Sequence, residues 1–289
     1  MASLKSLIPS KLLTAMVEET MRKGLVFGDV VNTDYEGIIK SAGDSVRIPV
    51  IGDVTVSDHT VNDTLTYESL DAADMLLEIT EQKRFSFAVD IVDEKQSIVS
   101  AAQLYADRAA YQLRDQADQF ISAKHSGAGI TSDLGTTGTP LEITAAASTG
   151  SYISVYELLS RIAKGLDNAN VPQEGRFVVI PPWLHAKMVL AGMLQYQNGD
   201  VQAYLNGSVG RLMGFDVRMS TNVVNYNTTG SKVMAGTDRA ISFAGQLLNV
   251  ETLNLETKYG TGVRGLYVYG AKVVQADALA VATVSEATG

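Results

Sequence analysis

The longest uninterrupted helical pattern covers residues 93–125 and constrains the fold more than any other segment. Asp93 suits the helix N-cap, Gln96 completes a capping box, and Gly127 ends the pattern. Apolar side chains recur at steps of mostly three and four, at Ile98, Ala102, Tyr105, Ala109, Leu113, Ala117, Phe120 and Ile121. Such a helix would be about 50 Å long. Because its apolar stripe is rich in alanine, its partner must pack closely, which predicts an elongated scaffold and no catalytic pocket.

The composition excludes several classes of protein. No cysteine is present, so neither disulfides nor thiolate metal sites can form, and His59, His125 and His185 lie too far apart for a ligand motif. The N-terminal residues do not resemble a signal peptide, and no apolar run approaches the length of a membrane span. We therefore predict a cytoplasmic protein of one large or two modest domains, with no cofactor, metal or membrane contact.

The negative charge is concentrated in one stretch. The whole chain carries a net charge of −9. Residues 44–82 contain nine acids and one base, Arg47, so this stretch carries 1 − 9 = −8 and the remainder only −1. A solvated acidic loop is the simpler interpretation. The alternative is that the stretch lies on a basic surface of another subunit.

The first 90 residues are expected to form an arm and a projecting pair of strands. Residues 1–43 start with a short amphipathic helix, from Ser10 to Gly24, and contain too little apolar surface to form a core. Residues 44–56 alternate apolar and polar side chains, and residues 75–89 form the return strand. A two-stranded excursion with few large apolar residues is marginal in isolation, so it must lie against something else.

A Gly/Thr/Ala-rich connection at residues 126–151 is the best internal boundary, and helix and strand patterns alternate after it. The expected elements are a helix capped by Ser154 and Glu157, a buried strand at 176–180, a helix opening at Pro181 and Pro182, a polar loop at 195–211, strands at 215–219 and 232–235, a short helix near 238–243, long strands at 247–256 and 263–274, and a last strand at 278–284.

No motif indicates catalysis. Gly260, Gly262 and Gly265 have the spacing of a dinucleotide-binding loop, but a strand pattern follows where that loop needs a helix, so we interpret them as a hairpin turn. His185 has no serine or carboxylate at a helical spacing, and the acids of 44–82 are spread along an excursion and not around a cleft. Basic runs interleaved with aromatic residues, typical of nucleic-acid binding, are absent.

Five segments of the sequence, in this order, resemble the major capsid proteins of tailed bacteriophages. They are NTDYEGIIKSAGDSVRIPVIGDVTV, FAVDIVDEKQS, ADRAAYQLRDQADQFI, RFVVIPPWLHAKMV and GRLMGFDVRMSTNV. The resemblance covers nearly the whole chain. It lies in the order of the segments and in their amino-acid sequences, not in a catalytic signature.

The resemblance implies an α+β fold with a fixed set of parts. These are an N-terminal arm (1–43), an extended two-stranded loop (44–82), a peripheral domain with a spine helix (83–126, helix 93–125), an axial α/β domain (127–245), the long strands and hairpin tip of the peripheral domain (246–274), and a C-terminal strand returning to the axial domain (275–289). On this basis Ala109→Leu is expected to hinder folding or assembly more than any change at His185.

The resemblance also implies where subunits meet. We expect acids of the extended loop to dock on bases of a neighbouring subunit. The acids are Asp53, Asp58, Asp63, Glu68, Asp71 and Asp74, and the candidate bases are Arg22, Lys23, Arg108, Arg114, Lys258 and Arg264. A polar loop with Gln197, Asn198, Asp200 and Asn206 is expected to line the axis of a hexamer or pentamer.

The implied function is a non-enzymatic coat protein of the virion, assembled in the host bacterial cytoplasm around double-stranded DNA. The arm helix begins almost at once, so a separate scaffolding protein is expected, together with a portal and possible decoration proteins. No lysine lies between Lys40 and Lys83, so no covalent lysine cross-link is expected from the extended loop. An encapsulin-type bacterial nanocompartment is the alternative of similar fold, and an α/β hydrolase-type enzyme is the alternative of a different class.

Overall fold

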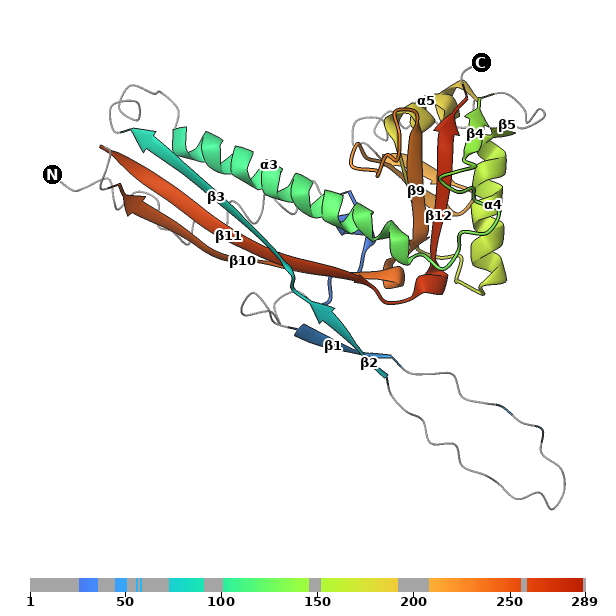
Figure 1. The fold of residues 1–289 in the computed structure, drawn as a ribbon, viewed down its shortest axis with the longest axis horizontal. Helices are drawn as coiled ribbons and strands as arrows, with labels where there is room; N and C mark the ends of the chain where they lie inside the picture. The colour runs from blue at the N-terminus through green and yellow to red at the C-terminus, as the bar shows by residue number, and fades with distance from the viewer. Residues whose placement is uncertain are drawn as a thin grey trace.

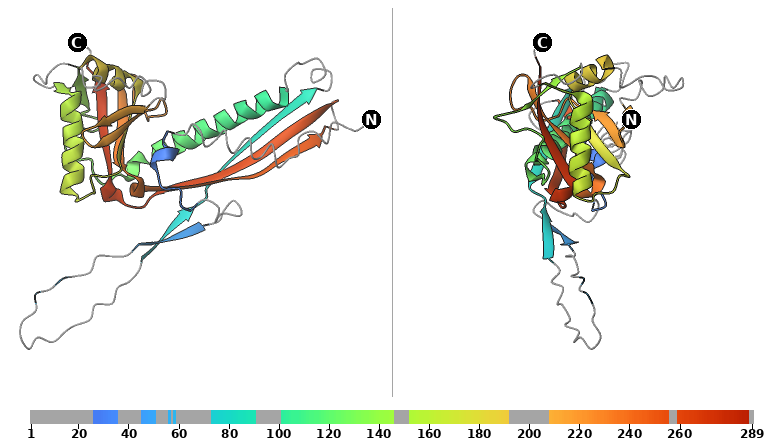
Figure 2. Two further views of the ribbon diagram at one scale, coloured as in Figure 1. Left: turned by 180° about the vertical axis from the view of Figure 1, so that it is seen from behind. Right: turned by 90° about the vertical axis from the view of Figure 1, so that its right-hand side faces the viewer.

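A computed structural model describes residues 26–35, 45–50, 56, 58, 73–90, 101–145, 152–191, 208–255 and 259–287. The arm helix expected at residues 10–24 and the start of the long helix at Asp93 lie outside these ranges. The described residues form a long limb, a compact limb and a projecting pair of strands (Figures 1 and 2).

The long limb is a three-stranded antiparallel sheet with a helix along one face. The strands are β10 (Ile241–Asn254), β11 (Gly260–Val273) and β3 (Glu81–Asp90), in the order β10-β11-β3. The two predicted long strands therefore exist and pair as a hairpin, with a register shift between Leu247 and Asn249. The helix α3 (Ala101–Ser122) continues as a 3-10 turn, Ala123–Gly127.

The buried face of α3 confirms part of the predicted stripe and corrects the rest. Ala106, Ala110, Leu113, Ala117 and Ile121 are buried against the sheet, which confirms the last three. Two predicted members were wrong. Tyr105 is 52% exposed, because its ring leans over the sheet edge onto Phe87 at 5.5 Å between centroids. Ala109 is only half-buried, because its neighbour Ala110 takes the central position.

The compact limb is a mixed seven-stranded sheet in the order β5-β4-β12-β9-β6-β8-β7. Its strands are β4 (Leu141–Thr144), β5 (Tyr152–Ser154), β6 (Arg176–Ile180), β7 (Ser208–Leu212), β8 (Phe215–Met219), β9 (Gly230–Thr237) and β12 (Leu279–Glu286). The helices α4 (Val155–Asn168) and α5 (Pro182–Leu190) pack on it and enclose its apolar core.

Local signals in the compact limb predicted α4, β6 and α5, but missed β4, which lies in the segment interpreted as a connection. The Ser154 hydroxyl accepts the Glu157 amide at 3.1 Å, as the capping box requires. Every residue of β6 is buried, and a proline opens α5. Two predictions were wrong. The helix expected near 238–243 is only a 3-10 turn, Asp238–Ala240, before β10 begins, and the loop expected to reach 211 ends in β7.

The predicted return strand at 75–89 is divided between two sheets. β2 (Ala73–Glu78) pairs with β1 (Ser45–Val50) in the projecting hairpin, whereas β3 joins the long limb. Between them the chain crosses β11 so closely that a Cβ on Gly270 would lie 2.3 Å from the Glu78 carbonyl oxygen. Ile79 is buried at this crossing with side chains of β1 and β2. The hairpin base therefore rests on the long limb.

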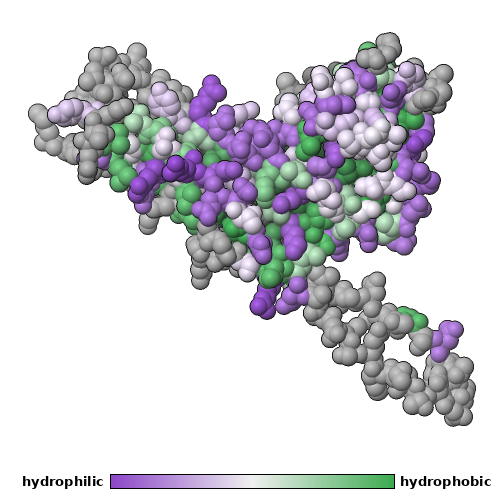
Figure 3. Space-filling model, viewed as in Figure 1, coloured by the Kyte–Doolittle hydropathy of each residue, from purple (hydrophilic) through white to green (hydrophobic). Residues whose placement is uncertain are grey.

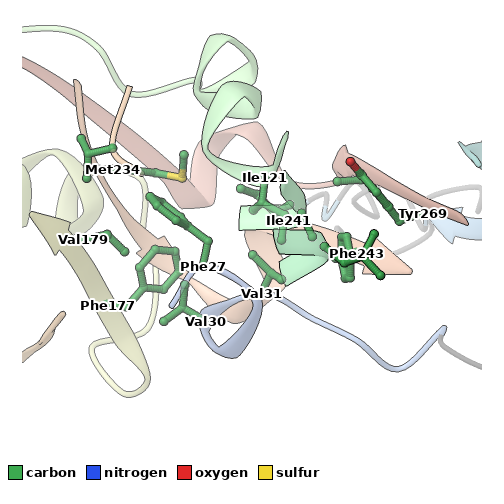
Figure 4. Packing of buried hydrophobic residues seen from close by; sticks show 14 of the residues in the cluster. Phe27, Val30, Val31, Ile121, Phe177, Val179, Met234, Ile241, Phe243 and Tyr269 are labelled. Atoms are coloured by element: carbon green, nitrogen blue, oxygen red, sulfur yellow. The ribbon is translucent and has the colours of Figure 1, made fainter. Parts of the chain in front are cut away.

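Residues 26–35 are part of the core, contrary to the prediction that residues 1–43 form an arm without one. Phe27 is 1% exposed and belongs to the largest apolar cluster, and Val30 and Val31 are buried in the same cluster. Figure 4 shows Phe27 beside Phe177 and Met234 of the compact limb. This short segment contributes apolar surface where the two limbs meet, and the helical pattern before it gave no sign of that role.

We expect Ala110→Leu to lower the free energy of unfolding by about 1–3 kcal/mol, because α3 has no room for a larger side chain there. Ala109→Leu is the matched control, since its position is half-buried and one residue away. Urea unfolding followed by tryptophan fluorescence or circular dichroism measures both. Equal losses for the two variants would contradict the observed orientation of α3.

Candidate functional site

The described residues contain no assembly of catalytic or metal-binding groups. No group of three or more His, Asp or Glu among them could hold a metal ion. Gly260, Gly262 and Gly265 lie within β11, so they do not open a helix. The prediction that they form the hairpin turn was wrong, because all three pair with neighbouring strands. The Phe85 ring occupies the space where Gly265 would carry a Cβ, so this glycine has a packing role. His185 is half-buried on α5.

Four described side chains have shifted pKa values, and burial is the main cause for each. Burial raises the pKa of Asp118 to about 6 and that of Tyr269 to about 12. It also raises the pKa of Tyr226 and lowers that of His125. Asp118 and His125 lie on α3 and its 3-10 extension, Tyr269 on β11 packs against Phe120 of α3, and Tyr226 precedes β9 in the compact limb. No pair of them forms the acid and base arrangement that general acid–base catalysis needs.

The surfaces predicted to contact other subunits include the projecting hairpin and several bases of the long limb. The described part of the projecting hairpin is chiefly its base, where β1 and β2 pair from Ser45↔Glu78 to Val50↔Ala73. Asp58 is exposed, and Asp74 lies 3.5 Å from Arg47 in an exposed ion pair of the hairpin itself. Four other predicted contact acids lie outside the described residues: Asp53, Asp63, Glu68 and Asp71.

The three predicted contact bases that the structure describes, Arg108, Arg114 and Arg264, do not form one patch. Arg264 lies on the sheet face away from α3, because its neighbours Val263 and Gly265 alternate with it along β11 and Val263 packs towards α3. Arg108 is exposed on α3, and Arg114 stacks on Tyr111 with its guanidinium carbon 4.9 Å from the ring centroid. The remaining three, Arg22, Lys23 and Lys258, lie outside the described residues.

Arg264 also has a partner within its own chain. Its Nε and Nη2 atoms donate to Glu251 Oε2 at 2.9 and 2.6 Å, across the β10–β11 pairing. This exposed pair links the two strands in the distal part of the β10–β11 hairpin. Tyr259, at the tip of that hairpin, is 89% exposed. The pair could not be predicted from the sequence, because its formation depends on the register of β10 and β11.

α3 packs on one face of the long-limb sheet and does not cover the opposite face. We call it the open sheet face; its described residues beyond the hairpin base are Arg84, Ser86, Glu251, Leu253, Arg264 and Leu266. Arg84 is an exposed base that sequence reasoning missed, although the alternation of β3 could have placed it. In the view of Figure 3, hydrophobic and hydrophilic side chains alternate along the long limb.

The predicted axis loop lies outside the described residues, including Gln197, Asn198, Asp200 and Asn206. The chain leaves the described structure at the end of α5, and re-enters it at β7. Leu190 is 78% exposed and Val189 43% exposed at that end of α5. An apolar helix end next to a polar segment is a surface that association with another subunit would cover.

Comparisons with known proteins agree with this geometry. No family model matches the sequence, and a search of curated proteins gives no match. A chain from Mycobacterium phage Che8 is 26% identical with a TM-score of 0.69, and the match covers 89% of this chain and 90% of that one. A chain from the capsid of cyanophage P-SCSP1u is 19% identical with a TM-score of 0.65, covering 92% and 89%.

A further match extends beyond phages. A chain of a virus-like particle from Pyrococcus furiosus is 13% identical with a TM-score of 0.54, covering 94% of this chain and 98% of that one. None of the described helices is long and apolar enough to cross a membrane. The matches span nearly the full length of both partners, so the likeness concerns the fold of the chain as a whole. The chain has the α+β fold of the phage major capsid proteins.

Proposed function

We propose that this protein is the major capsid protein of a tailed bacteriophage, and that it assembles into hexamers and pentamers of an icosahedral shell around double-stranded DNA. The observation that carries the proposal is the match in fold to phage capsid chains over about nine-tenths of both partners. The absence of a catalytic arrangement among the described residues is consistent with a structural role and not an enzymatic one.

The parts of the molecule would take distinct roles in such a shell. The compact limb, with the segment 127–245 and the final strand in 275–289, would point to the capsomer centre. The long limb, from 83–126 and 246–274, would form the periphery. The segment 44–82 would reach over a neighbouring subunit. Within the N-terminal segment 1–43, residues 26–35 would belong to the junction core, and only the remainder would act as an arm.

The acidic excursion would dock on a neighbour's open sheet face. The excursion carries a charge of −8 over residues 44–82. The open sheet face offers the base Arg84, together with Arg264, whose charge is shared with Glu251 of its own chain. Individual exposed ion pairs contribute only about 0–1 kcal/mol each. Around a closed symmetric assembly the same contact recurs in every subunit, so small contributions add together.

Other components follow from the same proposal. A portal, a separate scaffolding protein and possibly decoration proteins would complete the virion, and assembly would take place in the host bacterial cytoplasm. The DNA would be enclosed without sequence-specific contact, since the chain is acidic overall.

A nanocompartment shell is the second candidate, supported by the match to the virus-like particle from Pyrococcus furiosus. The lower TM-score of that match, 0.54 against 0.69, favours the phage capsid. The two kinds of shell would enclose different contents. Particles isolated from infected cells would contain packaged DNA and a portal in the first case and a protein cargo in the second.

Shell formation is tested directly by measuring the size of the particles that the purified protein forms. Size-exclusion chromatography with light scattering should show rings or megadalton particles, because the proposal requires closed assemblies. On a denaturing gel these particles should run as a single monomer band, since no lysine is available between Lys40 and Lys83 for a cross-link from the excursion. A stable monomer or dimer at every concentration would refute the capsid proposal, and a covalent ladder would refute the absence of cross-links.

We expect Arg84→Glu to weaken assembly and to reduce its dependence on salt, because the variant places a negative charge opposite the acidic excursion. Lys164→Glu is the matched control, since Lys164 is an exposed base on α4 in the compact limb. Sedimentation at low and high sodium chloride measures the assembled fraction. Equal behaviour of the two variants would show that the excursion docks elsewhere.

A further inference from the structure

The short helix α5 is apolar on its exposed side as well as on its buried side. Leu184 and Met188 are buried in the core of the compact limb. The exposed positions of the helix are also apolar, and they are Pro182, Ala186, Val189 and Leu190. We call these four residues the α5 stripe. Val189 is 43% exposed and Leu190 is 78% exposed. A helix that is apolar all round is usually buried on every side, so we expect another surface to cover the stripe.

The one lysine of α5 turns away from the stripe. Lys187 Nζ donates to the Ile143 carbonyl at 2.8 Å and to the Ala287 carbonyl at 3.3 Å, and the lysine side chain is only 12% exposed. The same atom lies 3.7 Å from Glu286. The helix contains no arginine and no acidic residue. The stripe therefore carries no charge, and two copies of it can meet without electrostatic repulsion.

α5 lies at the end of the compact limb that is remote from the long limb (Figures 1 and 2). Its contacts fix it across the ends of the sheet strands. Lys187 reaches β4 and the residue after β12, and Trp183 Nε1 donates to the Ser231 hydroxyl of β9 at 3.1 Å. In the proposed shell the compact limb points to the capsomer centre, so this end would approach the same end of neighbouring subunits.

We propose that the α5 stripe is a contact between copies of this chain, covered by the compact-limb end of the next subunit around a fivefold or sixfold axis. This inference rests on the proposed function and adds the residues that close the ring. α5 has nine residues, so it is about 13 Å long. A stable dimer buries about 800 Å² on each partner, which is more than a stripe of this length offers. The contact therefore suits a closed ring, where it recurs in every subunit beside other contacts.

The alternative cover is the chain's own segment 192–207, which follows α5 directly in the sequence. The two occupants predict different effects of a charge in the stripe. Cover by another subunit makes the charge weaken assembly, whereas cover by the same chain makes it weaken folding.

Leu190→Asp in the full-length protein separates these effects. Loss of the apolar contact and burial of a charge should raise the protein concentration at half-assembly at least about tenfold. Leu190→Met keeps an apolar side chain of similar volume and should assemble like the wild type. Ser160→Asp is the matched control, since Ser160 is exposed on α4 and the variant adds the same charge to the other helix of the compact limb. Sedimentation velocity over a concentration series measures assembly, and thermal unfolding followed by circular dichroism measures folding.

Trp183 gives a second measurement that needs no variant. It is the only tryptophan of the chain, it is half-buried, and it lies seven residues before Leu190, on the same side of α5. Acrylamide quenching of its fluorescence should decrease when the wild-type protein assembles, because the neighbouring subunit shields this side of the helix. Unchanged quenching on assembly would overturn the proposal.

Three further outcomes are distinct. Equal assembly of Leu190→Asp and Ser160→Asp would overturn this contact and leave the shell itself intact. A lower unfolding temperature of Leu190→Asp with unchanged assembly would also overturn it, and would assign the stripe to residues 192–207. A wild-type protein that stays monomeric would refute the proposed function and this contact together.

Discussion

The apolar cluster at the junction of the two limbs is the interaction on which the rest of the structure depends. Ile121 from α3, Ile241 and Phe243 from β10, and Phe177 from β6 meet there around Phe27. Both limbs have apolar surface of their own, and among the described residues this cluster joins them, together with the hydrogen bond from Asn222 to Asp115. A subunit of a closed symmetric assembly needs a fixed shape, because small errors in angle prevent closure. The junction therefore links the packing of one chain to the geometry of an assembly.

Much of the fold could be predicted from local sequence patterns. The period of α3, the capping box of α4 and the apolar run of β6 are each determined by residues close together in sequence. The division of the return strand could not be predicted, because it depends on the close crossing over Gly270, almost two hundred residues later. The burial of Phe27 was missed for the same reason, since its partners come from both limbs.

The candidate surfaces were predicted less completely than the fold. The accumulation of acids in residues 44–82 is visible in the sequence, but the position of their basic partners depends on strand register. Register places Arg264 opposite Glu251 and brings Arg84 onto the same face, while Arg108 lies on the helix across the sheet. The predicted bases Arg264 and Arg108 therefore lie on different surfaces. Of these surfaces, the proposal places the acidic excursion on the open sheet face.

A cryo-electron microscopy map of particles formed by the purified chain tests the central claim most directly. The account predicts a closed icosahedral shell of pentamers and hexamers, with the compact limb at the capsomer axes and the projecting hairpin of one subunit on the open sheet face of the next. A small oligomer without fivefold or sixfold symmetry, or a shell in which the hairpin contacts only its own subunit, would contradict it.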